Sequence, residues 1–213
     1  MGLASVYRSI VFETTLNDQR YVLLAGDWWK IDRDFVEEVE GQLGQIPVSN
    51  LEFPSPEHGE HEKDYLVRSV DGLRGSILLD QPNVWYGGGR SQIEVCDILT
   101  EEGTFIHAKA RGRSSTLSHL WSQGTVSAEA FASEEAFREK ARDLLPEARG
   151  GLLSTERPAR GAHDVVYLII GADPEMPWRS LPFFSKVALM QASRQLEIIG
   201  FPLSLAGTPS ENG

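Results

Sequence analysis

The sequence has a single cysteine, Cys96, and it lacks long apolar runs and fixed-period repeats. One thiol excludes an internal disulfide framework and any zinc site built from several cysteines of one chain. A membrane-spanning helix needs about 20 consecutive apolar residues, so a membrane protein is not expected. The first residues also lack the basic and apolar regions of a secretory signal, and we therefore expect a cytoplasmic protein.

Basic residues are also scarce. The 213 residues include 20 Lys and Arg against 31 Asp and Glu, which gives a formal net charge of −11. A protein that coats nucleic acid through bulk charge needs an excess of cations, so the composition argues against that class. The apolar content of 41% is sufficient for a folded core.

The acidic residues are unevenly distributed along the chain. Residues 27–64 contain eleven acids and three bases, whereas residues 103–128 contain no acid and carry Lys109, Arg111 and Arg113. A local phosphate-binding site is therefore compatible with the net charge. The alternative interpretation is an ordinary acidic surface followed by an ordinary strand and helix start.

The first 50 residues are predicted to form a small N-terminal attachment to the rest of the chain. Residues 7–14 and 20–25 are rich in β-branched and aromatic side chains on either side of an Asn-Asp pair, which predicts a β-hairpin. Asp34 is expected to cap a short helix that follows. The two prolines and the glycine of residues 48–59 predict a loop, so we expect an N-terminal attachment over residues 1–50.

Residues 60–213 predict an α/β core. The expected order is a helix, three strands, two helices, a strand, a helix and a strand. The strands are expected at residues 76–79, 92–99, 104–110, 165–170 and 201–205, and the helices at about residues 60–70, 114–124, 133–144 and 182–199. Gly124 is expected to end the second of these helices, Ser133 to cap the third and Gly200 to end the last. This order predicts a mixed sheet with helices on its faces.

The expected hairpin of residues 92–110 carries three polar residues that suit phosphodiester chemistry. Asp97 lies on its first strand, while His107 and Lys109 are two residues apart on its second strand and share one face. This set and the element order are similar to the restriction-endonuclease-like PD-(D/E)XK superfamily, which has an acid on one strand and an acid-x-Lys on the next. The resemblance implies a restriction-endonuclease-like core, with Mg²⁺ or Mn²⁺ as the cofactor. Such a cation neutralises developing charge and lowers the pKa of a bound water.

The resemblance also implies a role for each of these residues. Asp97 would bind the cation, Lys109 would polarise water or phosphate, and His107 would serve as ligand or base. Histidine stands where the superfamily usually has a carboxylate, and a neutral imidazole suits Mn²⁺ or Zn²⁺ better than Mg²⁺. Glu94 and Glu62 are candidates for the missing carboxylate, although Glu94 has the opposite strand parity to Asp97. The alternative is an exposed hairpin with ordinary polar residues.

A second group of polar residues begins directly after this hairpin. The candidate phosphate-binding residues are Arg111, Arg113, Ser114, Ser115, His119 and Gln123. The arginines and serines lie at a helix start, where unpaired backbone N–H groups favour an anion. The residues from Ser115 to Gln123 continue at a spacing of four and form a polar stripe. The alternative is the solvated side of a capped amphipathic helix.

Four separated strings occur in a characteristic order: YVLLAGDWWKIDRDFVEEV, IEVCDILT, FIHAKARGRSSTLSHLWSQGTVSAEAF and LPFFSKVAL. They resemble a sporadically distributed bacterial family of unknown function, whose members are usually longer and carry this region in their C-terminal part. The resemblance implies mobile or defence-related loci, hence an anti-phage context. It also implies a missing N-terminal region or a partner protein.

Three functions are therefore carried forward as hypotheses. The first is a metal-dependent nuclease-like domain that acts on nucleic-acid phosphodiesters. The second is a catalytically inactive nucleic-acid-binding module with the same fold. The third is a protein-interaction module that uses the acidic segment. Chelator-sensitive cleavage of DNA or RNA separates the first hypothesis from the other two.

Overall fold

A computed structural model describes residues 10–79, 83–86, 91–112 and 114–209 of the chain. The chain divides into two compact units, Met1–Gln45 and Ile46–Gly213. Each unit has its own secondary structure and is described separately.

The N-terminal unit is a three-stranded antiparallel sheet followed by a helix. Its elements are β1 (Phe12–Leu16), β2 (Gln19–Leu24), β3 (Asp27–Lys30) and α1 (Arg33–Leu43). Asn17 and Asp18 have positive φ values of 51° and 58°, which is the backbone of a type I′ hairpin turn. The predicted hairpin is thereby confirmed, and β3 adds a strand that the sequence pattern did not predict.

The start of α1 corrects one prediction. Asp32, not Asp34, is the N-cap residue, and its carboxylate accepts a hydrogen bond from the Asp34 backbone N–H at 2.8 Å. Asp34 instead lies in the first turn of the helix, where a carboxylate interacts favourably with the helix dipole. Both acids favour a helix start, so sequence pattern alone does not separate their roles.

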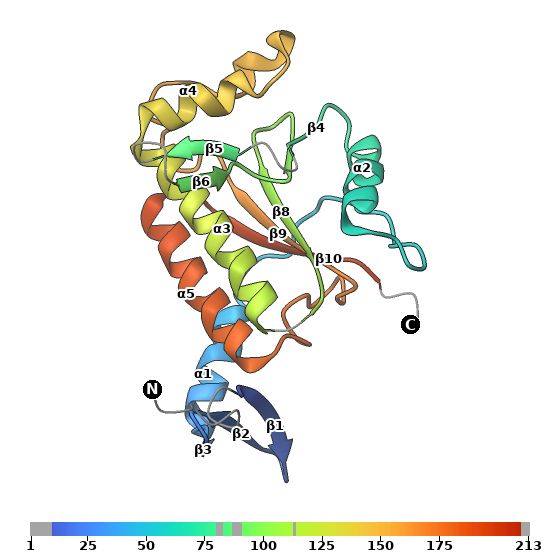
Figure 1. Ribbon diagram of the computed structural model, residues 1–213, viewed down its shortest axis with the longest axis vertical. Helices are drawn as coiled ribbons and strands as arrows, with labels where there is room; N and C mark the ends of the chain where they lie inside the picture. The colour runs from blue at the N-terminus through green and yellow to red at the C-terminus, as the bar shows by residue number, and fades with distance from the viewer. Residues whose placement is uncertain (1–9, 80–82, 87–90, 113, 210–213) are drawn as a thin grey trace, which may run out of the picture. The chain divides into compact units, whose positions relative to one another are not determined.

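The C-terminal unit is built around a mixed five-stranded sheet with the strand order β10-β9-β8-β7-β4 (Figure 1). The strands are β4 (Ile77–Leu78), β7 (Ile98–Leu99), β8 (Phe105–Ala110), β9 (Val165–Ile170) and β10 (Leu203–Gly207). β8, β9 and β10 are parallel, whereas β7 is antiparallel to both β8 and β4. The α/β class with a mixed sheet is confirmed. The restriction-endonuclease-like core stays a prediction.

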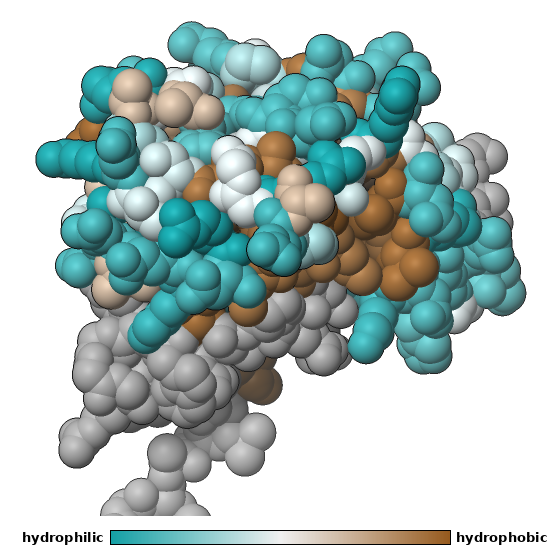
Figure 2. All heavy atoms as spheres, turned by 90° about the horizontal axis from the view of Figure 1, so that it is seen from above, coloured by the Kyte–Doolittle hydropathy of each residue, from teal (hydrophilic) through white to brown (hydrophobic). Residues whose placement is uncertain are grey.

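The helices and a second hairpin complete this unit. They are α2 (Glu62–Gly72), α3 (Ser114–Ser133), α4 (Glu135–Asp143), α5 (Phe183–Ile199), a 3₁₀ helix (Glu147–Leu152), and the hairpin of β5 (Asn83–Tyr86) and β6 (Ser91–Glu94). Among the described residues, no helix combines the length and the apolar composition needed to cross a bilayer. On the face seen in Figure 2, hydrophilic residues predominate and hydrophobic ones gather in one area.

Both faces of the sheet are covered, which explains the apolar sequence of β9. All six of its side chains are buried. Val166 and Leu168 belong to a core that includes Tyr65 and Leu66 of α2. Tyr167 points to the opposite face by strand alternation, and its ring contacts that of Trp121 in α3, with centroids 4.8 Å apart. In Figure 1, α3 and α5 lie side by side on this second face.

The predicted strand of residues 92–99 is wrong, because it is interrupted between β6 and β7. β6 pairs with β5 and not with β8. Asp97 lies in the interruption, where its backbone N–H donates to the Ile106 carbonyl and its carboxylate accepts from the Ala108 N–H at 2.7 Å. The Asp97 carboxylate thus takes the Ala108 N–H that a backbone carbonyl would accept if β7 continued, and the regular pairing with β8 ends here.

Gly124 does not end a helix, so that prediction is also wrong. α3 continues for 20 residues through this position. A Cβ atom on Gly124 would lie 2.5 Å from the ring of Tyr167, so glycine is required for close packing of helix against sheet.

The predicted cap at Ser133 is wrong as well. Ser133 is the last residue of α3, its hydroxyl donates to the Glu129 carbonyl, and Glu134 is the N-cap of α4. The predicted end of α5 at Gly200 is confirmed, since Gly200 has the left-handed φ of 97°.

Candidate functional site

Lys109 lies near the end of β8 and forms an ion pair with the first residue of α2. Its Nζ atom is 2.5 Å from Glu62 Oε1, and about a third of each side chain is exposed. The other oxygen, Glu62 Oε2, accepts a hydrogen bond from the Ala110 backbone N–H at 3.0 Å. One carboxylate therefore holds both the lysine side chain and the adjacent backbone at the end of the strand.

Asp97 binds the same edge of β8 two residues earlier. Its carboxylate accepts the Ala108 N–H at 2.7 Å, while Glu62 accepts that of Ala110. Backbone N–H groups two residues apart on a strand point to the same side. The two carboxylates therefore occupy successive positions along one strand edge, with Lys109 between their backbone partners.

Glu94 is held by a residue of α3. Its Oε2 atom accepts a hydrogen bond from Gln123 Nε2 at 3.0 Å. β6 ends at Glu94 and packs against α3, so these two elements determine where the carboxylate lies. We call Glu62, Glu94, Asp97, Lys109 and Gln123 the Lys109 cluster.

Electrostatic interactions connect the members of the Lys109 cluster. Burial works to lower the pKa of Lys109, but the hydrogen bond and charge of Glu62, with the charges of Asp97 and Glu94, outweigh burial and raise it. Lys109 is therefore an ammonium ion at neutral pH. Burial also raises the pKa of the Cys96 thiol, and the charges of Asp97 and Glu94 add to that effect. Cys96 is accordingly an unreactive thiol.

His107 lies in a different environment. Only 1% of the residue is exposed, and its ring centroid is 6.2 Å from that of Tyr167. Among the described residues, its Nε2 atom has no hydrogen-bond partner. Burial lowers the pKa of His107 to about 4, and no charged group of the described residues contributes to the shift. The structure therefore leaves His107 outside the Lys109 cluster, and its predicted role stays a prediction.

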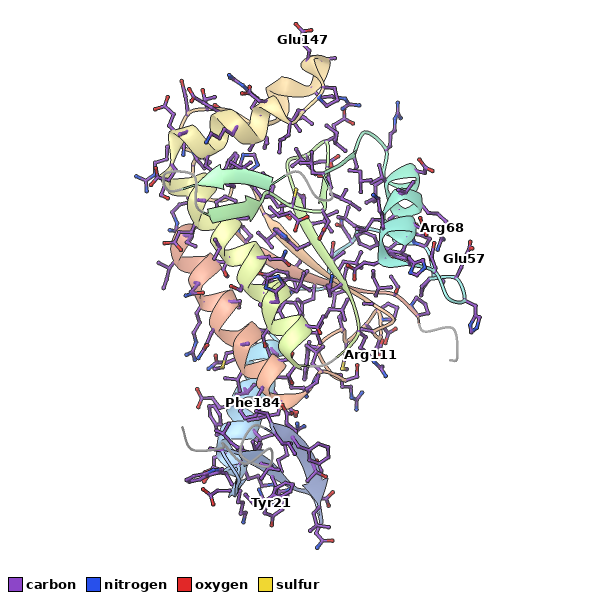
Figure 3. All side chains as sticks on the ribbon, viewed as in Figure 1. Tyr21, Glu57, Arg68, Arg111, Glu147 and Phe184 are labelled. Atoms are coloured by element: carbon purple, nitrogen blue, oxygen red, sulfur yellow. The ribbon has the colours of Figure 1, made fainter. Side chains whose placement is uncertain are left out.

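The candidate phosphate-binding residues are not brought to one point. Arg111 is exposed beyond the end of β8, as Figure 3 shows, and His119 is exposed on α3. Ser114 is joined to α5, because its carbonyl accepts from the Ser185 hydroxyl at 3.4 Å. Arg113 and the side chain of Ser115 lie outside the described residues. Gln123 donates a hydrogen bond to Glu94 and therefore belongs to the Lys109 cluster.

Sequence reasoning missed two kinds of contact in the Lys109 cluster. The N–H groups of Ala108 and Ala110 carry no signal in the sequence, because their availability depends on where β7 begins. The sequence indicated both residues of the Gln123–Glu94 contact separately. Gln123 was a candidate for phosphate binding and Glu94 a candidate for metal binding. Glu94 ends β6 and Asp97 lies between β6 and β7, so their strand parity does not determine whether the two carboxylates lie on the same side.

The Lys109 cluster fits a divalent cation by the chemistry of its oxygen atoms. Among the described residues, no three or more His, Cys, Asp or Glu side chains are arranged to hold a metal ion. Mg²⁺, however, usually binds one or two carboxylates together with waters and substrate phosphates, without an all-protein cage. Asp97 and Glu94 supply two carboxylates, which is the number that such a site needs.

Residues 2–209 match a family that is described only as a family of unknown function, DUF6119. The chain belongs to this family. Comparison with curated proteins and with solved structures gives no match. The predicted membership of a family of unknown function is therefore confirmed. The DUF6119 match carries no activity, and the resemblance to restriction endonucleases gains no support from these comparisons.

Proposed function

We propose that the C-terminal unit of this DUF6119 protein is a metal-dependent nuclease that hydrolyses nucleic-acid phosphodiester bonds. The observation that carries the proposal is the position of Lys109, which contacts Glu62 and is acted on by the charges of Asp97 and Glu94. Further support comes from the element order, since α2 precedes the antiparallel strands β4, β7 and β8, and α3 and β9 follow them.

Each residue has a stated task in this proposal. Asp97 and Glu94 hold the cation, and Gln123 fixes the position of Glu94. A bound divalent cation would neutralise phosphate charge and lower the pKa of a bound water. Lys109 stays protonated, so it acts as a hydrogen-bond donor to a phosphate oxygen and stabilises the charge that develops there. Arg111, which is exposed just beyond Lys109, is available to a neighbouring backbone phosphate.

The test is cleavage of duplex DNA, single-stranded DNA and RNA by the purified chain with Mg²⁺ or Mn²⁺, with and without EDTA. We expect chelator-sensitive cleavage that falls at least about 100-fold in Asp97→Asn and in Lys109→Met. Lys63→Met is the matched control, because it removes an exposed ammonium of α2 and should retain full activity. Absence of cleavage with every cation, or full activity in Asp97→Asn, would contradict the proposal.

Binding without cleavage would select the second hypothesis. In that case affinity for nucleic acid is expected to fall steeply with salt, because phosphate contacts release counterions. The anti-phage context is a prediction of the family resemblance, and protection of cells from phage by the wild-type chain but not by Lys109→Met would support it.

The N-terminal unit favours protein interaction as a second function. Eight of the thirteen exposed large hydrophobic side chains among the described residues lie in it, including Trp28 and Trp29 at 51% and 58% exposure. The rings of Phe12 and Trp28 are in contact, with centroids 6.3 Å apart, and contiguous exposed apolar surface is typical of interaction sites. A partner captured by the wild-type chain should be lost from a Trp28→Ser, Trp29→Ser variant, and its retention would contradict this function.

A further inference from the structure

Both oxygens of the Glu62 carboxylate are engaged by consecutive residues of β8. Oε1 contacts Lys109 Nζ at 2.5 Å, and Oε2 accepts from the Ala110 N–H at 3.0 Å. The carboxylate therefore fixes the lysine side chain relative to the backbone that carries it. Both bonds go to β8, so the Glu62 carboxylate is oriented toward this strand.

The position of Glu62 in α2 keeps its carboxylate in place. Glu62 is the first residue of the helix, where the positive end of the helix dipole favours an ionised carboxylate. One turn later, Tyr65 and Leu66 are buried in the core that also contains Ala108 of β8. Glu62 thus approaches β8 from a helix that is packed against the same strand.

Asp97 and Glu94 relate to Lys109 differently. Their negative charges raise the pKa of Lys109, and their hydrogen bonds described above go to the Ala108 N–H and to Gln123. Glu62 alone among the three carboxylates adds a side-chain hydrogen bond to Lys109. Glu62 therefore binds the lysine directly, whereas Asp97 and Glu94 affect its pKa through their charges.

The geometry points to Glu62 as a positioning residue that holds Lys109 toward the phosphate site, while Asp97 and Glu94 bind the divalent cation without it. This assignment rests on the proposed nuclease function, and it replaces the sequence-based expectation that Glu62 is a metal ligand. It makes the contact between α2 and β8 a determinant of how Lys109 is presented to substrate.

The test compares Glu62→Gln with Asp97→Asn and with the control Asp64→Asn, which removes an exposed carboxylate from the same helical turn. Mn²⁺ affinity is measured by calorimetry on the full chain. The ammonium pKa of Lys109 is measured from the lysine ¹³Cε resonances; the sequence has five lysines, and Lys109→Arg assigns the signal. Cleavage is measured in parallel.

Glu62→Gln is expected to keep Mn²⁺ affinity within about threefold, to lower the pKa of Lys109, and to slow cleavage by about 10- to 100-fold. Asp97→Asn is expected to weaken Mn²⁺ binding more than about tenfold, and Asp64→Asn to change none of the three measurements. Loss of Mn²⁺ affinity in Glu62→Gln equal to that in Asp97→Asn would overturn the assignment, as would an unchanged Lys109 titration. If the wild-type chain neither binds Mn²⁺ nor cleaves, the proposed nuclease function fails, and the Lys109 titration still decides whether Glu62 holds the lysine.

Discussion

Lys109 and His107 are two residues apart on β8, yet their environments are opposite. Lys109 is one third exposed, contacts Glu62 and has a raised pKa. His107 is buried against Tyr167, and its pKa is lowered to about 4. Two residues of a strand span about 7 Å, which is sufficient to pass from a charged rim into an apolar interior. The motif that places both residues on one face therefore does not place both in one site.

The largest effect expected from this contrast is a loss of stability in acid, because the buried His107 resists protonation in the folded chain. The unfolded chain takes up a proton as pH falls below 6.5, whereas the folded chain resists until about pH 4. Above pH 6.5, His107 is neutral in both states and does not reduce the free energy of unfolding. Between pH 7 and pH 4, protonation of His107 in the unfolded chain lowers the free energy of unfolding by about 3 kcal/mol. His107→Leu should remove that part of the loss in urea unfolding at a series of pH values.

His119→Gln is the control for this experiment, because His119 is exposed on α3 and the variant retains His107. It should lose stability with acid as the wild type does. Equal acid dependence in wild type and His107→Leu would show that His107 is not held neutral in the interior. It would then belong with Lys109 as a polar residue of the site.

The sequence predicted the parts of this region that depend on residue periodicity. β8, β9 and α5 were located because their apolar residues follow the expected spacing, and Asp97 and Lys109 were selected by residue type and position. Burial of His107 was not predicted, because it depends on Tyr167, which lies 60 residues later in the chain. The broken strand at Asp97 was missed because a carboxylate there takes the place of a backbone partner, which no local pattern records.

The second effect concerns the packing beside His107. Ala at position 124 would place Cβ 2.5 Å from the Tyr167 ring, so Gly124→Ala should force α3 or Tyr167 to shift. Overpacking of this kind costs about 1–3 kcal/mol, less up to about 1 kcal/mol for the better helix propensity of alanine. We therefore expect a net loss of about 1–2 kcal/mol in chemical denaturation.

Gly41→Ala provides the matched control, because Gly41 is also inside a helix and a Cβ there meets nothing within 4 Å. That variant should be stabilised by about 0.5–1 kcal/mol. If Gly124→Ala is equally stabilising, the close approach of α3 to Tyr167 is refuted.

The smallest effect tests the Lys109 side of the comparison through Gln123. Gln123→Leu removes the donor that holds Glu94 at 3.0 Å, while a similar side-chain volume is kept on α3. Outer partners of a metal ligand commonly contribute about tenfold or more to affinity or activity, so we expect about tenfold weaker Mn²⁺ binding.

Two variants serve as controls for Gln123→Leu. Ser122→Ala changes an exposed residue one position earlier on α3 and should leave Mn²⁺ binding unchanged. His107→Leu should also leave it unchanged, because His107 lies outside the Lys109 cluster. A loss of Mn²⁺ binding in His107→Leu but not in Gln123→Leu would reverse the comparison, because the cation would then lie on the buried side of β8.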